Sequence, residues 1–393
     1  MSKQYFFEAG SFPDLSYTEL LTTFESFHLK KDIVHRFSPE IFLVKSNDVN
    51  PEILEKIFKR LGGFIRYGEI IDDLDSFLTG FTTHEGKVVF GITVLGIESN
   101  LSQKKLGNSI KEGLKEYGIS SRFIAPNKNE KSLNYGQIQY NHILRKGFEL
   151  CILNNGKEEI YGNTVLIQNV EEFAQRDLDR PYTDIEMGVL PPKLARMMVN
   201  FTGLNSGILW DPFCGSGTIP MEAAVLGFNF LASDIDSNAV HHTEENIKWL
   251  DKEGLIDDVF YEAFRLDVKQ PDHEIVKRLK NTDISGIVCE PFMGAAQKRE
   301  LADINAEKLL NEVKSLYKAL FKLIDEKIEK RGIKVVIIIP SYKTKSGWKT
   351  FGVRELLTNR WEVLNTYYSG GRDLKWSRKN SIITRNIFIL NRT

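Results

Sequence analysis

WDPFCGSGTIPMEAA, residues 210–224, joins the end of a strand, a glycine-rich turn and the start of a helix. The apolar residues 208–210 run into Asp211, which is typical of a buried parallel strand that ends in a loop. The glycines of 215–217 allow a tight turn through which the backbone can approach a ligand. A helix is predicted over 218–227, because its proline falls in the first turn, where the missing N–H has no partner. This order predicts backbone N–H groups that point at a ligand above the sheet edge.

A second strand, predicted over 228–232, runs into Ser-Asp-Ile-Asp. Asp234 follows the glycines by about twenty residues, the spacing at which an acidic residue meets ribose hydroxyls. No lysine follows Gly217, so the turn is not a phosphate-binding loop, and no basic residue is placed to meet a pyrophosphate. A pocket for a ribose and an uncharged tail suits S-adenosylmethionine. The alternative is a purely structural turn with chance acidic residues.

Three segments together resemble the THUMP-domain RNA methyltransferases: LPPKLARMMVN (190–200), DPFCGSGTIPMEAA and SDID. The resemblance covers nearly the whole chain and is greatest to the branch that methylates the exocyclic N2 of guanine in tRNA, usually at position ten. It implies an α/β class I Rossmann-like methyltransferase domain, with a doubly wound, mainly parallel sheet, behind an N-terminal α+β ferredoxin-like and THUMP module. It also implies S-adenosylmethionine as cofactor and tRNA as partner.

The composition is that of an ordinary globular protein. The 393 residues are 42% hydrophobic and 27% charged, and they are enough for two or three domains. No apolar run has the length of a membrane span, and the first residues lack the pattern of a signal peptide. Three scattered cysteines argue against a disulfide framework and against a zinc site. We therefore expect a cytoplasmic protein without metal or membrane contact, and a monomer.

The net charge of −1 does not by itself favour a nucleic-acid partner. A tRNA-binding protein needs only a local basic surface, because phosphate attraction is screened within about 8 Å at physiological salt. Basic residues that could form such surfaces are Lys111 and Arg122 in the first half, and Lys375 and Arg378 near the end. Lysines on a helix are otherwise a solvated face. The charge pattern therefore permits RNA binding without establishing it.

Four segments are predicted along the chain: a ferredoxin-like α+β unit (1–65), a THUMP-like RNA-binding domain (66–170), a linker (171–192) and the class I catalytic domain (193–393). Periodicity and turn residues in the first two segments predict helices over 18–27, 51–61 and 101–117, strands over 62–71, 88–96, 120–126 and 163–169, and a helix-and-strand pair over 135–155. The linker is polar and punctuated by proline over 174–192 and shows no clean periodicity there, so it is expected to be ordered and to pack on the following domain.

The last segment alternates strands and helices. Strands are predicted over 208–210, 228–232, 259–266, 286–289, 335–339, 362–368 and 382–390, and helices over 193–202, 218–227, 239–250, 274–279, 306–330 and 351–357. The pattern predicts a doubly wound sheet that closes with an antiparallel pair.

The strand predicted over 286–289 ends in Glu290, Pro291 and Phe292. The resembled family has Asp or Asn there, then Pro-Pro and an aromatic residue. Glu290 keeps a carboxylate one bond further out, about 1.5 Å, that could accept the protons of an exocyclic amine, and Phe292 could stack on a flipped base. The alternative is an ordinary turn after a strand. The departure from the family pattern leaves the target atom open.

Residues expected at the cofactor follow the ends of the strands. Asp211 is expected to orient the glycine turn or the ammonium group of the cofactor, and Asp267 is expected at the adenine amino group by the resemblance. The full set is Leu190, Pro191, Asp211, Phe213, Gly215, Ser216, Gly217, Thr218, Asp234, Ile235 and Asp267. In the linker, Arg176 and Arg180 resemble a family signature and are either an internal salt-linked clasp or tRNA contacts.

The sequence therefore predicts a tRNA guanine-N2 methyltransferase. Two alternatives remain open. The first is an amino-methyltransferase of the same fold that acts on adenine N6 or cytosine N4 of RNA or DNA, because an acidic residue, a proline and an aromatic residue would serve any of these amines. The second is a non-catalytic RNA-binding protein that retains the fold.

Overall fold

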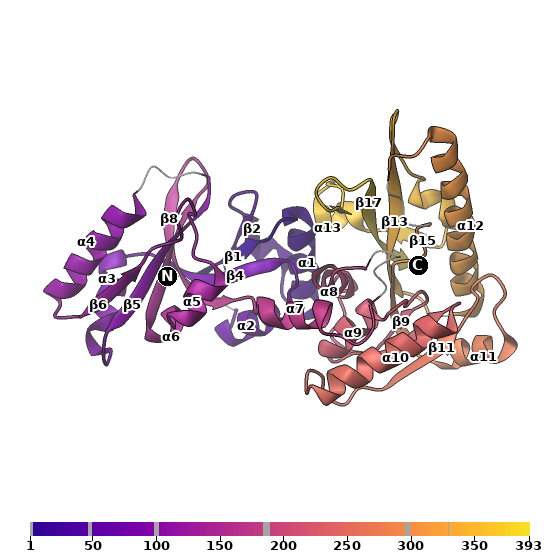
Figure 1. Ribbon diagram of the computed structural model, residues 1–393, viewed down its shortest axis with the longest axis horizontal. Helices are drawn as coiled ribbons and strands as arrows, with labels where there is room; N and C mark the ends of the chain where they lie inside the picture. Colours follow the sequence, from indigo (N-terminus) through magenta and orange to yellow (C-terminus); the bar gives the residue numbers. More distant parts are fainter. Residues whose placement is uncertain (1–2, 46–48, 98–101, 184–188, 295–298, 329) are drawn as a thin grey trace. The chain divides into compact units, whose positions relative to one another are not determined.

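The computed structural model describes residues 3–45, 49–97, 102–183, 189–294, 299–328 and 330–393 (Figure 1). The chain divides into two compact units. Unit 1 consists of Met1–Ser16 and Leu29–Glu171, and unit 2 of Tyr17–His28 and Glu172–Thr393. Residues 184–188 of the predicted linker lie outside the described residues. No helix in the described part of the chain is both long enough and apolar enough to cross a membrane.

Unit 1 is built on one mixed sheet. Its strands are neighbours in the order β2 (Val34–Arg36), β3 (Ile41–Lys45), β1 (Gln4–Ala9), β4 (Phe64–Ile71), β8 (Glu159–Ile167), β7 (Gly147–Asn154), β5 (Val88–Gly96) and β6 (Ser121–Ile124). Neighbours are antiparallel except that β5 runs parallel to both β6 and β7. Its helical segments are η1 (Lys31–Ile33), α2 (Pro51–Arg60), α3 (Leu74–Thr79), η2 (Gly80–Thr83), α4 (Gln103–Glu116), α5 (Tyr135–Tyr140) and α6 (Ile143–Lys146), while α1 (Pro13–Ser26) has residues in both units.

A buried ionic cluster crosses this sheet. Arg66 on β4 donates to Glu8 on β1 at 2.5 Å and also to Glu149 on β7. Glu149 accepts two further hydrogen bonds, from Thr93 and Thr164. Such bonds offset the cost of removing charges from water. Strand β4 passes through the predicted boundary between residues 65 and 66, so the two segments predicted there share one sheet, and their separation into two domains stays a prediction.

Unit 2 has the doubly wound, mainly parallel sheet that the sequence predicts. Its strands follow the order β11 (Tyr261–Arg265), β10 (Asn229–Asp234), β9 (Ile208–Asp211), β12 (Ile284–Cys289), β13 (Lys334–Thr344), β17 (Ile383–Arg392) and β15 (Trp361–Val363). The pairs from β11 to β13 are parallel, and β17 is antiparallel to both neighbours. Two short strands, β14 (Gly347–Lys349) and β16 (Lys375–Trp376), pair with β13 and β17. The chain order reverses between β9 and β12, which is where ligands bind in such sheets.

Helices cover both faces of this sheet (Figure 1). On one side α12 (Asp303–Lys327) buries Tyr317, Phe321 and Ile324 against the strands. On the other side lie α8 (Pro192–Asn200), α9 (Thr218–Val225) and α10 (Ser237–Lys252), and α9 packs against both α8 and α10. The remaining helical segments are α7 (Val170–Leu178), α11 (His273–Asn281), η3 (Val353–Leu356) and α13 (Asn365–Ser369).

Two sequence expectations were wrong, and the linker contains the helix α7, for which the sequence showed no clean periodicity. The helix predicted over 351–357 is only the 3-10 turn η3. The strand predicted over 362–368 stops after β15 and continues as α13. The cause is Asn365, whose side chain donates to the carbonyl of Ile387 at 2.7 Å and accepts from the N–H of Ile389 at 2.8 Å. The amide thus takes the backbone groups that a longer strand would use.

Candidate functional site

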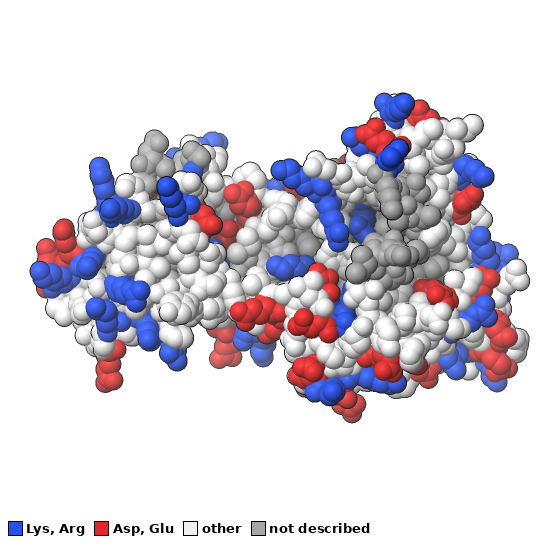
Figure 2. Space-filling model, in the orientation of Figure 1, with Lys and Arg blue, Asp and Glu red and all other residues white. Residues whose placement is uncertain are grey.

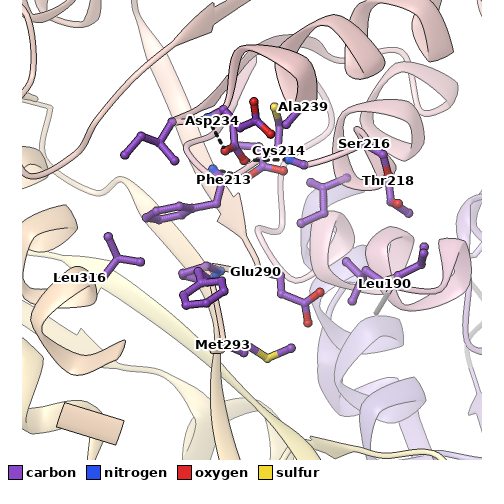
Figure 3. Close-up of a pocket in the computed structure, with 18 of the residues that line it drawn as sticks. Leu190, Phe213, Cys214, Ser216, Thr218, Asp234, Ala239, Glu290, Met293 and Leu316 are labelled. Carbon is purple, nitrogen blue, oxygen red and sulfur yellow. Dashed lines mark hydrogen bonds between the residues drawn. The ribbon is translucent and has the colours of Figure 1, made fainter. Parts of the chain in front are cut away.

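A cavity of about 610 Å³ opens in unit 2 at the carboxyl ends of β9, β10 and β12 (Figure 3). Most of the predicted cofactor and catalytic residues line it. Figure 3 shows that Asp234 and Glu290 belong to the same pocket, with Phe213 between them in this view. The predicted residues on its wall are Leu190, Asp211, Phe213, Gly215, Ser216, Thr218, Asp234, Ile235, Asp267, Glu290, Pro291, Phe292 and Arg378. Pro191 and Gly217 adjoin lining residues but are not themselves on the wall.

Two carboxylates hold the glycine turn in place. The N–H of Phe213 donates to Asp211 Oδ1 and the N–H of Gly215 donates to Asp234 Oδ2, each at 3.0 Å. Gly217 has a φ of +85°, and a Cβ atom there would lie 2.9 Å from the hydroxyl oxygen of Thr243. Only glycine combines this conformation with this close approach. The turn is therefore tied to the end of β10 and is too tight for a side chain at Gly217.

Side chains of helix α10 also hold the glycine turn in place. The buried Asn246 amide donates to the carbonyl of Ser216 at 2.8 Å and to the carbonyl of Tyr182 at 2.9 Å, and it accepts from the N–H of Tyr182 at 3.0 Å. Thr243 adds a bond to the carbonyl of Gly215 at 2.9 Å. Sequence reasoning missed both residues, because a polar residue on a helix gives no local sign that it faces a turn.

The acidic residues around the turn have different environments. Burial raises the pKa of Asp211 well above its usual range, against the opposing bond from the Phe213 N–H. Burial also raises the pKa of Asp234, and backbone N–H donors from Asp236 and Gly215 oppose it. Asp267 is partly buried and accepts from the N–H of Lys269 at 2.8 Å. This wall has hydrogen-bond acceptors for hydroxyl and ammonium groups.

Glu290 stands at the end of β12 and is bound by an arginine. Arg385 Nε donates to Glu290 Oε1 at 2.5 Å, and its Nη2 lies 3.4 Å from Oε2. Burial raises the pKa of Glu290, and the Arg385 guanidinium works in the opposite direction. The nearby Phe292 ring is 44% exposed on the pocket wall, where it is free to meet a flat ligand.

Two tyrosines hold the loop that follows Glu290. The hydroxyl of Tyr317 on α12 donates to the carbonyl of Pro291 at 3.5 Å, and the hydroxyl of Tyr342 on β13 donates to the carbonyl of Met293. Both rings are buried, so the two bonds come from the core. The position of the loop is thus set by residues that the sequence pattern did not single out.

Arg176 and Arg180 lie inside unit 2. Arg176 Nε and Arg196 Nε donate to the two oxygens of the buried Glu222, at 2.5 and 2.7 Å. Arg180 donates to the hydroxyl of Thr218 at 2.7 Å and is only 4% exposed. A buried guanidinium cannot reach a phosphate, so these positions favour the internal clasp over the predicted RNA contact.

The other predicted RNA-binding residues are exposed. Lys111 on α4 and Arg122 on β6 belong to unit 1, and Figure 2 shows Lys and Arg gathered over the part that carries these elements. Residues 103–157 contain ten Lys and Arg but four Asp and Glu, so the basic charge of unit 1 is concentrated there. In unit 2, Lys375 pairs with Asp373 at 2.7 Å. Among the described residues, no group of His, Cys, Asp and Glu is arranged to hold a metal ion.

Comparisons with known proteins agree with this geometry. Residues 180–356 match the family UPF0020, described as an RMKL-like methyltransferase domain. The tRNA (guanine(10)-N2)-dimethyltransferase of Methanocaldococcus jannaschii is 35% identical over 37% of this chain and 42% of its own length. The corresponding enzyme of Methanothermobacter thermautotrophicus is 36% identical over 36% of this chain and 38% of its own. The chain thus spans less than half the length of these two curated relatives.

Two further matches extend the comparison. The crystal structure of TrmN from Thermus thermophilus covers 99% of this chain and 100% of its own, with a TM-score of 0.52 and 15% identity, which shows the fold. The class I methyltransferase fold is thereby confirmed, and the methyltransferase domain supports S-adenosylmethionine as the cofactor. A probable tRNA (guanine(10)-N2)-dimethyltransferase of Methanothermococcus thermolithotrophicus is 32% identical over 32% of this chain and 74% of its own length. By this match the chain belongs to the methyltransferase family of these relatives.

Proposed function

We propose that the chain transfers a methyl group from S-adenosylmethionine to the exocyclic N2 of a guanosine in tRNA, at position 10. The observation that carries the proposal is the single cavity that contains both the carboxylate-held glycine turn and Glu290. Membership of a family whose curated relatives are named for this reaction supports the choice of base and position.

The residues around the turn fit S-adenosylmethionine. Carboxylates at Asp211, Asp234 and Asp267 can accept from ribose hydroxyls, an ammonium group and an adenine amino group. Ile235 is 55% exposed and offers an apolar surface to a purine ring. Such an acidic wall would repel a nucleotide phosphate, whereas it tolerates a cationic sulfonium. When bound there, the cofactor supplies a methyl group that is already activated, so the residues of the chain need mainly to align the acceptor.

Glu290 would receive the acceptor amine. The lone pair of an exocyclic amine is delocalised into the base, and an N–H bond to a carboxylate helps to localise it. Glu290 lies at the strand end next to the glycine turn and lines the cavity, and Phe292, which is 44% exposed, presents its ring for stacking of a flipped base. We assign Glu290 to accept or hold the amine proton, Pro291 to shape the loop and Phe292 to stack.

Binding of tRNA would use exposed basic residues. Lys111 and Arg122 are candidates on unit 1, and the exposed Arg378, which lines the pocket, is a candidate on unit 2. Phosphate contacts of this kind position an RNA without reading its sequence. The THUMP-like role of unit 1, the monomeric state and a cytoplasmic location belong to the same proposal.

The test is methylation of defined RNA. The purified chain is incubated with S-adenosylmethionine and an unmodified tRNA transcript, and the digested nucleosides are identified by mass spectrometry. We expect N2-methylguanosine or N2,N2-dimethylguanosine, its loss in a transcript with adenosine at position 10, and a rate about 10²–10⁴-fold lower for Glu290→Gln. A methylated adenine or cytosine would instead support the amine-methylating alternative.

Calorimetry separates the non-catalytic alternative. S-adenosylmethionine should bind to the unaltered chain and more weakly to Asp234→Ala, whereas Asp257→Asn, which alters an exposed carboxylate outside the pocket wall, should bind as the parent does. A chain that binds tRNA but ignores the cofactor would contradict the proposed enzyme.

A further inference from the structure

Arg385 lies on the pocket wall, and two nitrogens of its guanidinium group, Nε and Nη2, bind the carboxylate of Glu290 as a fork. Its Nε is 2.5 Å from Oε1 and its Nη2 is 3.4 Å from Oε2, so both carboxylate oxygens are engaged from one side. Only 9% of Arg385 is exposed. Charge-assisted bonds with this fork geometry fix the orientation of a carboxylate as well as its charge. The direction in which Glu290 faces the cavity therefore depends on a residue of β17.

A tryptophan supports the arginine itself. Trp376 on β16 is the direct partner of Arg385 in the antiparallel register, and the guanidinium carbon lies 5.0 Å from the centre of the indole ring. Guanidinium groups are attracted to the face of an indole. Arg385 is thus held by the ring of Trp376 as well as by the carboxylate of Glu290.

Arg385 is the cation that counters the burial of Glu290. Asp211 faces it from β9 and repels a second negative charge, while Cys289 on its own strand and Tyr317 on α12 contribute no positive charge. Arg378 lines the same pocket from the loop before β17. Burial and Asp211 would favour a protonated Glu290 if Arg385 were absent. A protonated carboxyl would donate a proton where the amine needs an acceptor.

We propose that Arg385 is a positioning residue for the methyl transfer: it holds the carboxylate of Glu290 ionised and aimed at the acceptor amine, and Trp376 keeps the guanidinium in register. This inference rests on the proposed function, because it assigns to Glu290 the role of amine acceptor. It adds Arg385 of β17 and Trp376 of β16 to the residues of the glycine turn and of the Glu-Pro-Phe segment that form the site.

Three variants of the full chain test the inference. Arg385→Met removes the charge and the fork, Arg385→Lys keeps the charge alone, and Arg360→Met removes an exposed arginine outside the pocket wall as a matched control. For each we measure kcat and KM for tRNA against pH, the affinity for S-adenosylmethionine by calorimetry, and the thermal midpoint. Arg385→Met should lower kcat on the order of 10²-fold with the cofactor affinity unchanged, and the acidic limb of its kcat profile should move to higher pH. Arg385→Lys should restore part of both.

A direct titration keeps the inference testable without turnover. Carboxyl carbon NMR of the chain labelled at glutamate, with the Glu290 signal assigned through Glu290→Gln, should show a higher midpoint in Arg385→Met than in the parent. An unchanged midpoint, or an unchanged kcat profile, overturns the inference. If the midpoint differs between Arg385→Met and the parent but the parent methylates no guanosine, the proposed function is overturned, and only the control of the Glu290 charge by Arg385 is left standing.

Discussion

Substitution of Asn246 by alanine should loosen the glycine turn without touching the cavity wall. Asn246 is fully buried on α10 and makes three hydrogen bonds, two to Tyr182 and one to the carbonyl of Ser216. Ser216 lines the pocket, whereas Asn246 does not. The variant therefore separates the support of the turn from its contacts with a ligand.

The expected cost follows from the bonds that are lost. A buried hydrogen bond contributes about 1 kcal/mol net, and the backbone groups left without a partner add to the loss, so we expect at least about 3 kcal/mol of destabilisation. For a domain of about 150–250 residues this lowers the thermal midpoint by roughly 6–12 °C. A looser turn should also weaken cofactor binding by about tenfold, which corresponds to about 1.4 kcal/mol.

Circular dichroism and calorimetry with S-adenosylmethionine measure the two effects. Asn238→Ala is the matched control, because Asn238 is exposed on the same helix and its bond to Asp236 is made by the backbone. The reasoning is refuted if Asn246→Ala melts and binds the cofactor as Asn238→Ala does.

Three further outcomes are expected. Glu222→Gln should destabilise the chain by about 3–5 kcal/mol in urea unfolding, because two buried guanidinium groups lose their counter-charge; a loss under ~1 kcal/mol would contradict the clasp. Burial raises the pKa of Asp211 in the folded state, so its ionisation costs stability as the pH rises. Asp211→Asn should therefore be about 0.5–2 kcal/mol more stable than the parent at neutral pH and no more stable below about pH 4, whereas equal stability at both would refute this. Lys111→Ala and Arg122→Ala should each reduce the salt slope of tRNA affinity by about 0.7–1, and unchanged slopes would exclude the phosphate contacts.

The parts of the site that the sequence could predict are those encoded locally. The glycine turn, Asp211 before it and Asp234 at the next strand end lie within one strand–helix–strand unit, so spacing alone brings them together. The strands around them are strongly apolar, which explains why their positions agree closely with the prediction.

Residues that hold the site in place from distant parts of the sequence could not be predicted from local spacing. Arg385 lies 95 residues from Glu290, and only the return of β17 beside β13 brings the two near each other. Arg176 and Arg180 stand in a polar segment, where composition does not distinguish a buried arginine from an exposed one. Glu222 did indicate that a buried arginine was needed. It is an acidic residue within the apolar helix α9, and a buried carboxylate requires a cationic partner.

Glu290 stands where the resemblance implies Asp or Asn, and it keeps a carboxylate acceptor in the site. One additional bond displaces a carboxylate by about 1.5 Å, and on an exposed loop it would also add rotational freedom. Here the fork of Arg385 restrains both oxygens, and the tyrosines of α12 and β13 hold the loop carbonyls. The Glu290 carboxylate and the carbonyls of the loop are therefore both restrained by residues of other elements. The amine that the site selects should depend on Glu290 and Arg385 acting together. The two residues must therefore be altered separately before the segment from Glu290 to Phe292 is judged inactive.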